Sequence, residues 1–150
     1  MGRKAINAKR DAQSVPGVKA GDDAREALRQ RLARAAYAAR QYAIDAARLV
    51  CDEKCEDILV LDLRGVSTIC DYFVIATGTS DRQMRAVADH LRELGKTRGE
   101  EPYSVSGYDE GAWIVVDYVD VVVHLFDTEK RSYYDLEALW GDCPRVEWGA

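Results

Sequence analysis

The stretch that most constrains the fold of this chain runs from Gly111 to Phe126 and reads GAWIVVDYVDVVVHLF. Two apolar segments rich in β-branched residues flank a short acidic break, a pattern that favours an antiparallel hairpin over one long helix. With a two-residue turn at Tyr118 and Val119, Asp117 lies opposite Asp120. The same pairing places Trp113 opposite His124. The sequence therefore predicts a β-hairpin near the centre of the fold.

Alternation along the strands divides the side chains of this hairpin between two faces. One face is apolar throughout and must lie against a core; it carries Ala112, Ile114, Val116, Val121, Val123 and Leu125. The other face is mixed and carries Trp113, Val115, Asp117, Asp120, Val122, His124 and Phe126. Two interpretations of its acidic corner stay open. The aspartates are solvated turn residues beside a helix-covered tryptophan, or the corner binds a positively charged partner.

Hydrophobic spacing and capping residues predict the remaining elements. Helices are expected from Asp22 or Asp23 to Val50, from Asp81 to about Leu94 behind a Ser80–Gln83 capping box, and over Ser132–Trp140. Further strands are expected at Asp57–Leu63, Tyr72–Thr77 and Tyr103–Ser106. This order predicts one α/β domain over residues 22–150, with a mixed sheet of four to five strands built from hairpins and flanked by helices.

Charge is divided unevenly along the chain, whose formal net charge is −5. Up to Arg34 the chain holds nine Lys or Arg residues and four Asp or Glu residues, so the remainder is clearly acidic. An acidic domain attracts basic proteins but does not bind nucleic acid through its general field, because phosphate contacts need Lys and Arg. We therefore expect no sequence-specific nucleic-acid partner. Residues 1–21 have no apolar periodicity, and we expect them to form a flexible basic extension; contact with RNA is the alternative.

Several features bear on compartment and cofactors. No apolar run reaches the length of a membrane span, and the first residues lack the hydrophobic segment of a signal peptide, so we expect a cytoplasmic protein. Cys51, Cys55, Cys70 and Cys143 fit that compartment as reduced thiols. Cys51 and Cys55 have no second ligand pair at zinc-binding spacing. We therefore expect no metal and no cofactor.

Four segments, in their order and spacing, resemble the ribosomal silencing factor family RsfS, also called Iojap: DILVLDL, DYFVIATGTSDRQ, AWIVVDYVDVVVHLF and RSYYDLEALWGDCP. The resemblance covers about residues 42–148. It implies a nucleotidyltransferase-like fold and a homodimer. It also implies that the protein binds the large ribosomal subunit through its fourteenth protein and so obstructs association with the small subunit.

The resemblance favours the binding interpretation of the acidic corner, because the implied partner is a basic protein. The residues that would bind it are Trp113, Asp117, Tyr118, Asp120, Val122 and His124. The hairpin turn of the family reads Asp-Tyr-Gly-Asp, whereas this chain has Val119 in place of the glycine. Because a β-branched residue disfavours positive φ, we expect a turn that is strained or of another type.

Two other functional classes stay open beside this one. A nucleotidyltransferase-like enzyme would use the Gly78–Ser80 turn to hold a phosphate at a helix N-terminus. Downstream of Ser80, however, no pair of carboxylates with magnesium-binding spacing follows in a convincing strand, so we expect no enzyme. A self-associating module would use an exposed apolar face of the sheet, and this is compatible with ribosome binding.

Overall fold

The computed structural model of the protein describes residues 16–149. The described residues fall into two compact units, one that ends at Ala38 and one that begins at Ala39, and each unit is described by itself. Helix α1 spans Pro16–Asp52, so the expected helix start at Asp22 or Asp23 is wrong and residues 16–21 are helical. The rest of the expected flexible extension, residues 1–15, lies outside the described residues.

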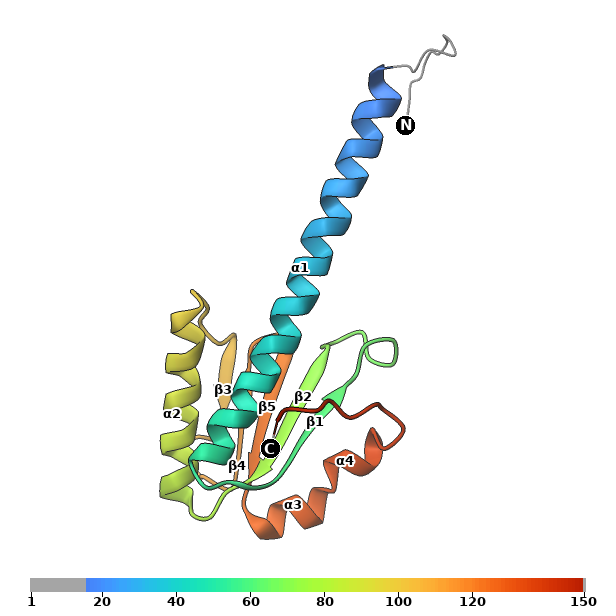
Figure 1. Ribbon diagram of the computed structural model, residues 1–150. Coiled ribbons are helices and arrows are strands. Elements are labelled where there is room, and N and C mark those ends of the chain that lie inside the picture. The colour runs from blue at the N-terminus through green and yellow to red at the C-terminus, as the bar shows by residue number, and fades with distance from the viewer. Residues whose placement is uncertain (1–15, 150) are drawn as a thin grey trace. The chain divides into compact units, whose positions relative to one another are not determined.

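The second unit is organised around one five-stranded mixed sheet (Figure 1). Its strands are β1 (Glu56–Asp62), β2 (Tyr72–Thr77), β3 (Ser104–Ser106), β4 (Trp113–Asp117) and β5 (Val121–Phe126), in the order β1-β2-β5-β4-β3. The β1–β2, β3–β4 and β4–β5 pairs are antiparallel, and β2 and β5 pair in parallel. The expected mixed sheet with hairpins is confirmed.

The register of the β4–β5 hairpin differs from the predicted one by two residues. Asp117 lies opposite Val122, not opposite Asp120, and Trp113 lies opposite Phe126, not opposite His124. The predicted turn at Tyr118 and Val119 is therefore wrong. A shift by two residues leaves the alternation of side chains unchanged. For this reason the assignment of side chains to the two faces is correct although the pairing is not.

The turn itself lies at Val119 and Asp120. The Tyr118 N–H donates to the Val121 carbonyl at 2.9 Å, which extends the ladder by one residue pair. Val119 has a φ of 75°, and the Asp120 N–H donates to the Tyr118 carbonyl at 2.9 Å, as in a γ-turn. The Asp117 carboxylate also accepts the Val119 N–H at 2.7 Å. Of the two expected outcomes, the strained turn is the one observed.

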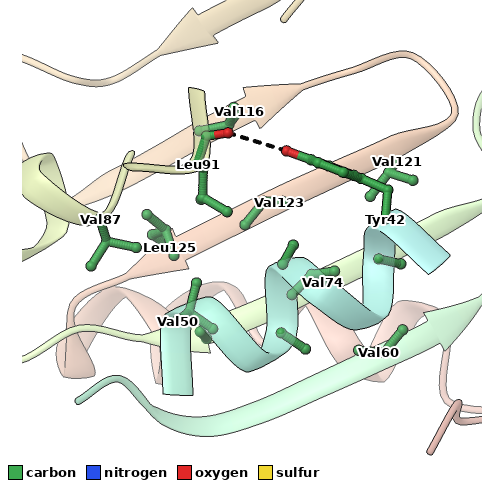
Figure 2. Close-up of a cluster of buried hydrophobic side chains, with 14 of the residues drawn as sticks. Tyr42, Val50, Val60, Val74, Val87, Leu91, Val116, Val121, Val123 and Leu125 are labelled. Atoms are coloured by element: carbon green, nitrogen blue, oxygen red, sulfur yellow. Dashed lines mark hydrogen bonds between the residues drawn. The ribbon is translucent and has the colours of Figure 1, made fainter. Parts of the chain in front are cut away.

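The part of α1 from Ala39 to Asp52 and helix α2 cover the apolar face of the sheet (Figure 1). Helix α2 spans Asp81–Thr97, and Ser80 caps it by accepting the Gln83 N–H at 3.0 Å. Figure 2 shows Tyr42 of α1 reaching across the valines of the sheet to the carbonyl of Leu91 in α2, an O···O distance of 3.3 Å. Tyr118 donates to the same carbonyl at 2.8 Å. Two hydroxyls thus satisfy one buried carbonyl where the helices meet β4.

The closing segment differs from the single helix expected over Ser132–Trp140. It forms α3 (Thr128–Tyr134) and α4 (Leu136–Leu139), separated by Asp135 in the left-handed conformation. The start of α3 follows from Asp127, whose side chain accepts the Lys130 N–H at 2.7 Å, so the cap lies before Ser132. The chain then runs along β1, where the Val146 N–H donates to the Val60 carbonyl at 2.9 Å.

Candidate functional site

Trp113 is the central side chain of the mixed face of the hairpin. Its indole stacks on the Phe126 ring at a centroid distance of 4.8 Å, and Tyr134 of α3 lies 4.6 Å away on centroids. The indole is half-buried, and Tyr134 is 47% exposed. Trp113 is therefore held between β5 and α3 with part of its surface open. The interpretation of a helix-covered tryptophan holds only in part, because α3 covers one part of the indole and leaves the rest accessible.

His124 supports the indole from the neighbouring strand. The Trp113 Nε1–H donates to His124 Nδ1 at 3.2 Å, which requires an unprotonated Nδ1 and places the ring proton on Nε2. Burial lowers the pKa of His124 to about 4, so the ring is neutral at pH 7. The His124 ring also packs in a T-shaped arrangement with the ring of Phe73 in β2, at a centroid distance of 4.6 Å. His124 is consequently a fixed acceptor beneath Trp113.

The acidic corner contains a third aspartate that sequence reasoning missed. Asp71 precedes β2 as Asp120 precedes β5, and the parallel pairing of these strands brings the two residues together. The Asp71 N–H donates to the Asp120 carbonyl at 2.9 Å. Burial and the Asp120 charge raise the pKa of the Asp71 carboxyl. Asp71, Asp117 and Asp120 therefore form a concentrated negative corner. The signal for Asp71 was its position directly before a strand, which it shares with Asp120.

Val115 joins the indole to this corner along β4. Trp113, Val115 and Asp117 occupy alternate positions and are all half-buried, so one continuous row spans about 13 Å of the strand. The neighbouring strand β3 offers only Ser104 and Ser106 beside them, two small exposed residues that leave the row open. We call Trp113, Val115, Asp117, Asp120 and Tyr134 the β4 surface.

The other two predicted site residues lie elsewhere. Tyr118 points to the core face, where its ring packs at 4.8 Å from that of Tyr42 and its hydroxyl is bonded to Leu91. Val122 is buried on the mixed face in a cluster with Phe126 and Cys143. The structure thus brings together Trp113, Asp117 and Asp120 at the surface, places His124 and Val122 beneath them, and separates Tyr118.

Aromatic residues from the closing segment extend this face. Tyr134 contacts Trp113, and Trp140 after α4 meets Phe73 at a centroid distance of 6.0 Å. Arg131 anchors α3 by donating to Thr77 Oγ1 at 2.9 Å and to Glu137 at 3.0 Å. The sequence predicted a single helix over Ser132–Trp140. The break at Asp135 removes that helix, so the contribution of Tyr134 was missed.

The turn before α2 has a local structural role. Thr79 N–H donates to Gln83 Oε1 at 2.9 Å, and Arg82 N–H donates to its neighbour Asp81 at 2.8 Å. Since Gln83 N–H is bonded to Ser80, three amides at this end already have acceptors. A Cβ on Gly78 would lie 2.2 Å from Met84 Cγ, which explains the glycine by packing. Helix capping therefore accounts for the Gly78–Ser80 turn.

The thiols show no common site. Cys51 is exposed and Cys55 is buried, and burial raises the pKa of Cys55 and of Cys70 to about 11. Within residues 16–149, no group of three or more His, Cys, Asp or Glu side chains is placed to hold a metal ion. Among the helices of that same region, none is long and apolar enough to cross a membrane.

A family model, curated relatives and a solved structure were each found to be similar to this chain. The model of the family described as "Ribosomal silencing factor during starvation" matches residues 36–149. Ribosomal silencing factor RsfS of Bacillus subtilis is 46% identical over 102 residues, covering 67% of this chain and 86% of that protein. The protein of the same name from Halalkalibacterium halodurans is 41% identical and covers 68% and 87%. A crystal structure of a protein from Chromobacterium violaceum has a TM-score of 0.63 at 36% identity and covers 70% and 85%.

Proposed function

The chain belongs to the ribosomal silencing factor family, and we propose that it binds the large ribosomal subunit through the subunit's fourteenth protein and blocks association with the small subunit. The observation that carries this proposal is the β4 surface: a half-open tryptophan held in place by aromatic neighbours, with aspartates at the end of the same row. Aromatic anchors next to charge are typical of protein interfaces.

The roles of the residues follow from their positions. Trp113 and Tyr134 would supply the apolar anchor, and Asp117 and Asp120 would meet basic side chains of the partner. His124 and Val122 lie beneath the surface and would hold the anchor in place. Tyr118 would act from the core side by fixing the turn that carries Asp120. Complementary charge mainly speeds encounter, whereas the buried part of the anchor slows release.

The mechanism is steric and needs no chemical step. A protein bound at the joining face of one subunit excludes the other by its volume, so inhibition scales with occupancy. The occupied amides before α2 give the alternative nucleotidyltransferase activity no support. In this proposal the protein acts in the cytoplasm, where its target is found, without a cofactor. The resemblance also implies a homodimer, which equilibrium sedimentation of the purified chain tests.

The proposal is tested by co-sedimentation of the purified chain with large subunits. Asp117→Asn together with Asp120→Asn removes two charges and keeps an acceptor for the Val119 N–H. We expect this variant to bind at least tenfold more weakly. The control is Asp52→Asn with Glu93→Gln, two exposed acidic residues of α1 and α2 with the same change in charge. Equal binding by wild type and the Asp117/Asp120 variant would remove the site assignment.

A further inference from the structure

The first unit of the chain carries a charge opposite to that of the second. Residues 1–38 hold nine of the 21 basic and four of the 26 acidic side chains, a net charge of +5. The remaining residues carry a net charge of −10, and the two parts together give the formal charge of −5 for the whole chain. The family match begins at residue 36, so almost all of this basic unit lies outside it. The β4 surface does not account for this part of the chain.

Within the described part of this unit, the positive charge is concentrated on one stretch of α1. Residues 25–34 contain Arg25, Arg29, Arg31 and Arg34, and all four are exposed. Two of them are neutralised, because Arg25 pairs with Asp22 at 3.1 Å and Arg29 pairs with Glu26 at 2.6 Å. Arg31 and Arg34 make no ion pair with any residue that the structure describes. Their guanidinium groups are available to an outside anion.

We propose that this arginine segment, residues 25–34 of α1, binds the phosphate backbone of RNA without reading its sequence. Arg31 and Arg34 are three residues apart, so they lie on one side of the helix about 4.5 Å apart along its axis, where both can meet phosphates of one strand. The ion-paired Arg25 and Arg29 lie on the opposite side. All four are arginine and none is lysine, and the guanidinium fork binds phosphate through two parallel hydrogen bonds. The contact would offset the repulsion between RNA and the acidic second unit.

Other occupants fit the same segment less well. Among residues 20–38 the exposed large apolar side chains are Leu28, Leu32 and Tyr37, and the other apolar side chains are alanines, which gives a membrane little apolar area. A second copy of the segment would bring arginine next to arginine, and like charges at a helix interface oppose pairing. RNA supplies the opposite charge and needs no apolar groove.

The test measures binding of the full chain to a short fluorescein-labelled RNA duplex over a range of salt concentrations. Arg31→Gln with Arg34→Gln should flatten the plot of log affinity against log salt by about two units of slope and weaken binding at low salt by about tenfold or more. The matched control is Arg82→Gln with Lys96→Gln, two exposed residues of α2 that give the same change in charge. We expect this control to leave the slope unchanged.

Three results would overturn the proposal. The first is no binding of the duplex by the wild-type chain, and the second is an equal effect of the α2 control. The third is binding of anionic phosphatidylserine vesicles, but not of RNA, in a manner that depends on Arg31 and Arg34. The Asp117→Asn, Asp120→Asn variant should keep full affinity for the duplex, so failure here and failure of the proposed silencing function are distinguishable.

Discussion

Val119 has the least favourable backbone conformation in the hairpin. Its φ of 75° lies in the region that a β-branched side chain avoids, and its side chain is 51% exposed, so packing offers little compensation. The turn is held by its neighbours, through Asp117 and the Tyr118–Val121 hydrogen bond. These hydrogen bonds therefore hold Val119 in its unfavourable backbone conformation, next to Asp120.

Val119→Gly should relieve this strain. Glycine adopts positive φ at no steric cost, but it also gives the unfolded chain more conformational freedom, which lowers stability. We expect a net gain of about 1 kcal/mol in the free energy of unfolding. Urea denaturation measures it. Val66→Gly is the control, because Val66 is similarly exposed and has no positive φ. A loss of stability in Val119→Gly would show that the turn is not strained.

His124 makes stability depend on pH in a defined direction. Burial lowers its pKa in the folded state from 6.5 to about 4, so the unfolded chain binds the proton more tightly. The stability contributed by neutral His124 is fully present above pH 6.5 and is lost as the pH falls toward 4. The difference amounts to about 3 kcal/mol.

Urea denaturation between pH 7 and pH 4 tests this dependence. His124→Gln should lose markedly less stability over that range than the wild type. His90→Gln is the control, because the Glu53 carboxylate at 2.7 Å raises the pKa of His90 and its contribution runs in the opposite direction, lost as the pH rises. The same acid loss in wild type and His124→Gln would contradict the assignment of a buried, neutral ring.

At the level of elements, α2 packs so closely on β4 that a glycine is required. A Cβ on Gly95 would lie 2.8 Å from both Cε1 and Oη of Tyr118 and 2.9 Å from the Glu100 carbonyl oxygen. Tyr118 cannot move away freely, because its hydroxyl is bonded to Leu91 of the same helix. The helix and the hairpin are therefore fixed relative to one another at this contact.

Gly95→Ala should destabilise the protein in spite of the better helix propensity of alanine. We expect a net cost of about 1 to 2 kcal/mol, measured by thermal or urea unfolding. At Gly141 the nearest atom to an added Cβ is 3.6 Å away, so Gly141→Ala serves as the control with little change. Equal stability of the two variants would mean that the close approach of α2 to Tyr118 does not affect the free energy of unfolding.

The elements differ in how far sequence could predict them. Tyr72–Thr77 was predicted with its observed bounds, and the start of α2 followed from Ser80, because strand alternation and capping are local signals. The parallel pairing of β2 with β5 was not predicted, since it joins strands far apart in the chain. The left-handed Asp135 between α3 and α4 was also missed, because aspartate is compatible with a continuing helix.

At the scale of the whole molecule, the β4 surface could be predicted only in part, because some of its neighbours come from segments far apart in the chain. The mixed face with Trp113, Asp117 and Asp120 followed from local alternation. Tyr134 and Asp71 join this face only through the packing of α3 and the parallel pairing of strands. Tyr118 was expected at the surface as part of the turn. The turn lies one residue later, so Tyr118 pairs with Val121 and its side chain points to the core, where it packs on Tyr42.

Tyr134→Ala tests whether the aromatic anchor extends beyond the hairpin. The ring is 47% exposed, so its removal should cost little stability but should weaken binding to large subunits by about tenfold. Tyr103→Ala is the control, because this tyrosine is 77% exposed and precedes β3. Unfolding measurements beside the binding assay separate the two effects. Binding lost equally in both variants would argue against a localised anchor.

The central claim is that occupation of the large subunit through the β4 surface keeps the small subunit away. The most direct measurement is subunit joining on sucrose gradients, with the purified chain titrated into separated subunits. Joined ribosomes should decrease in proportion to the bound chain, and the Asp117→Asn, Asp120→Asn variant should need a correspondingly higher concentration. Subunits that join normally while the large subunit is saturated with the chain would contradict the account.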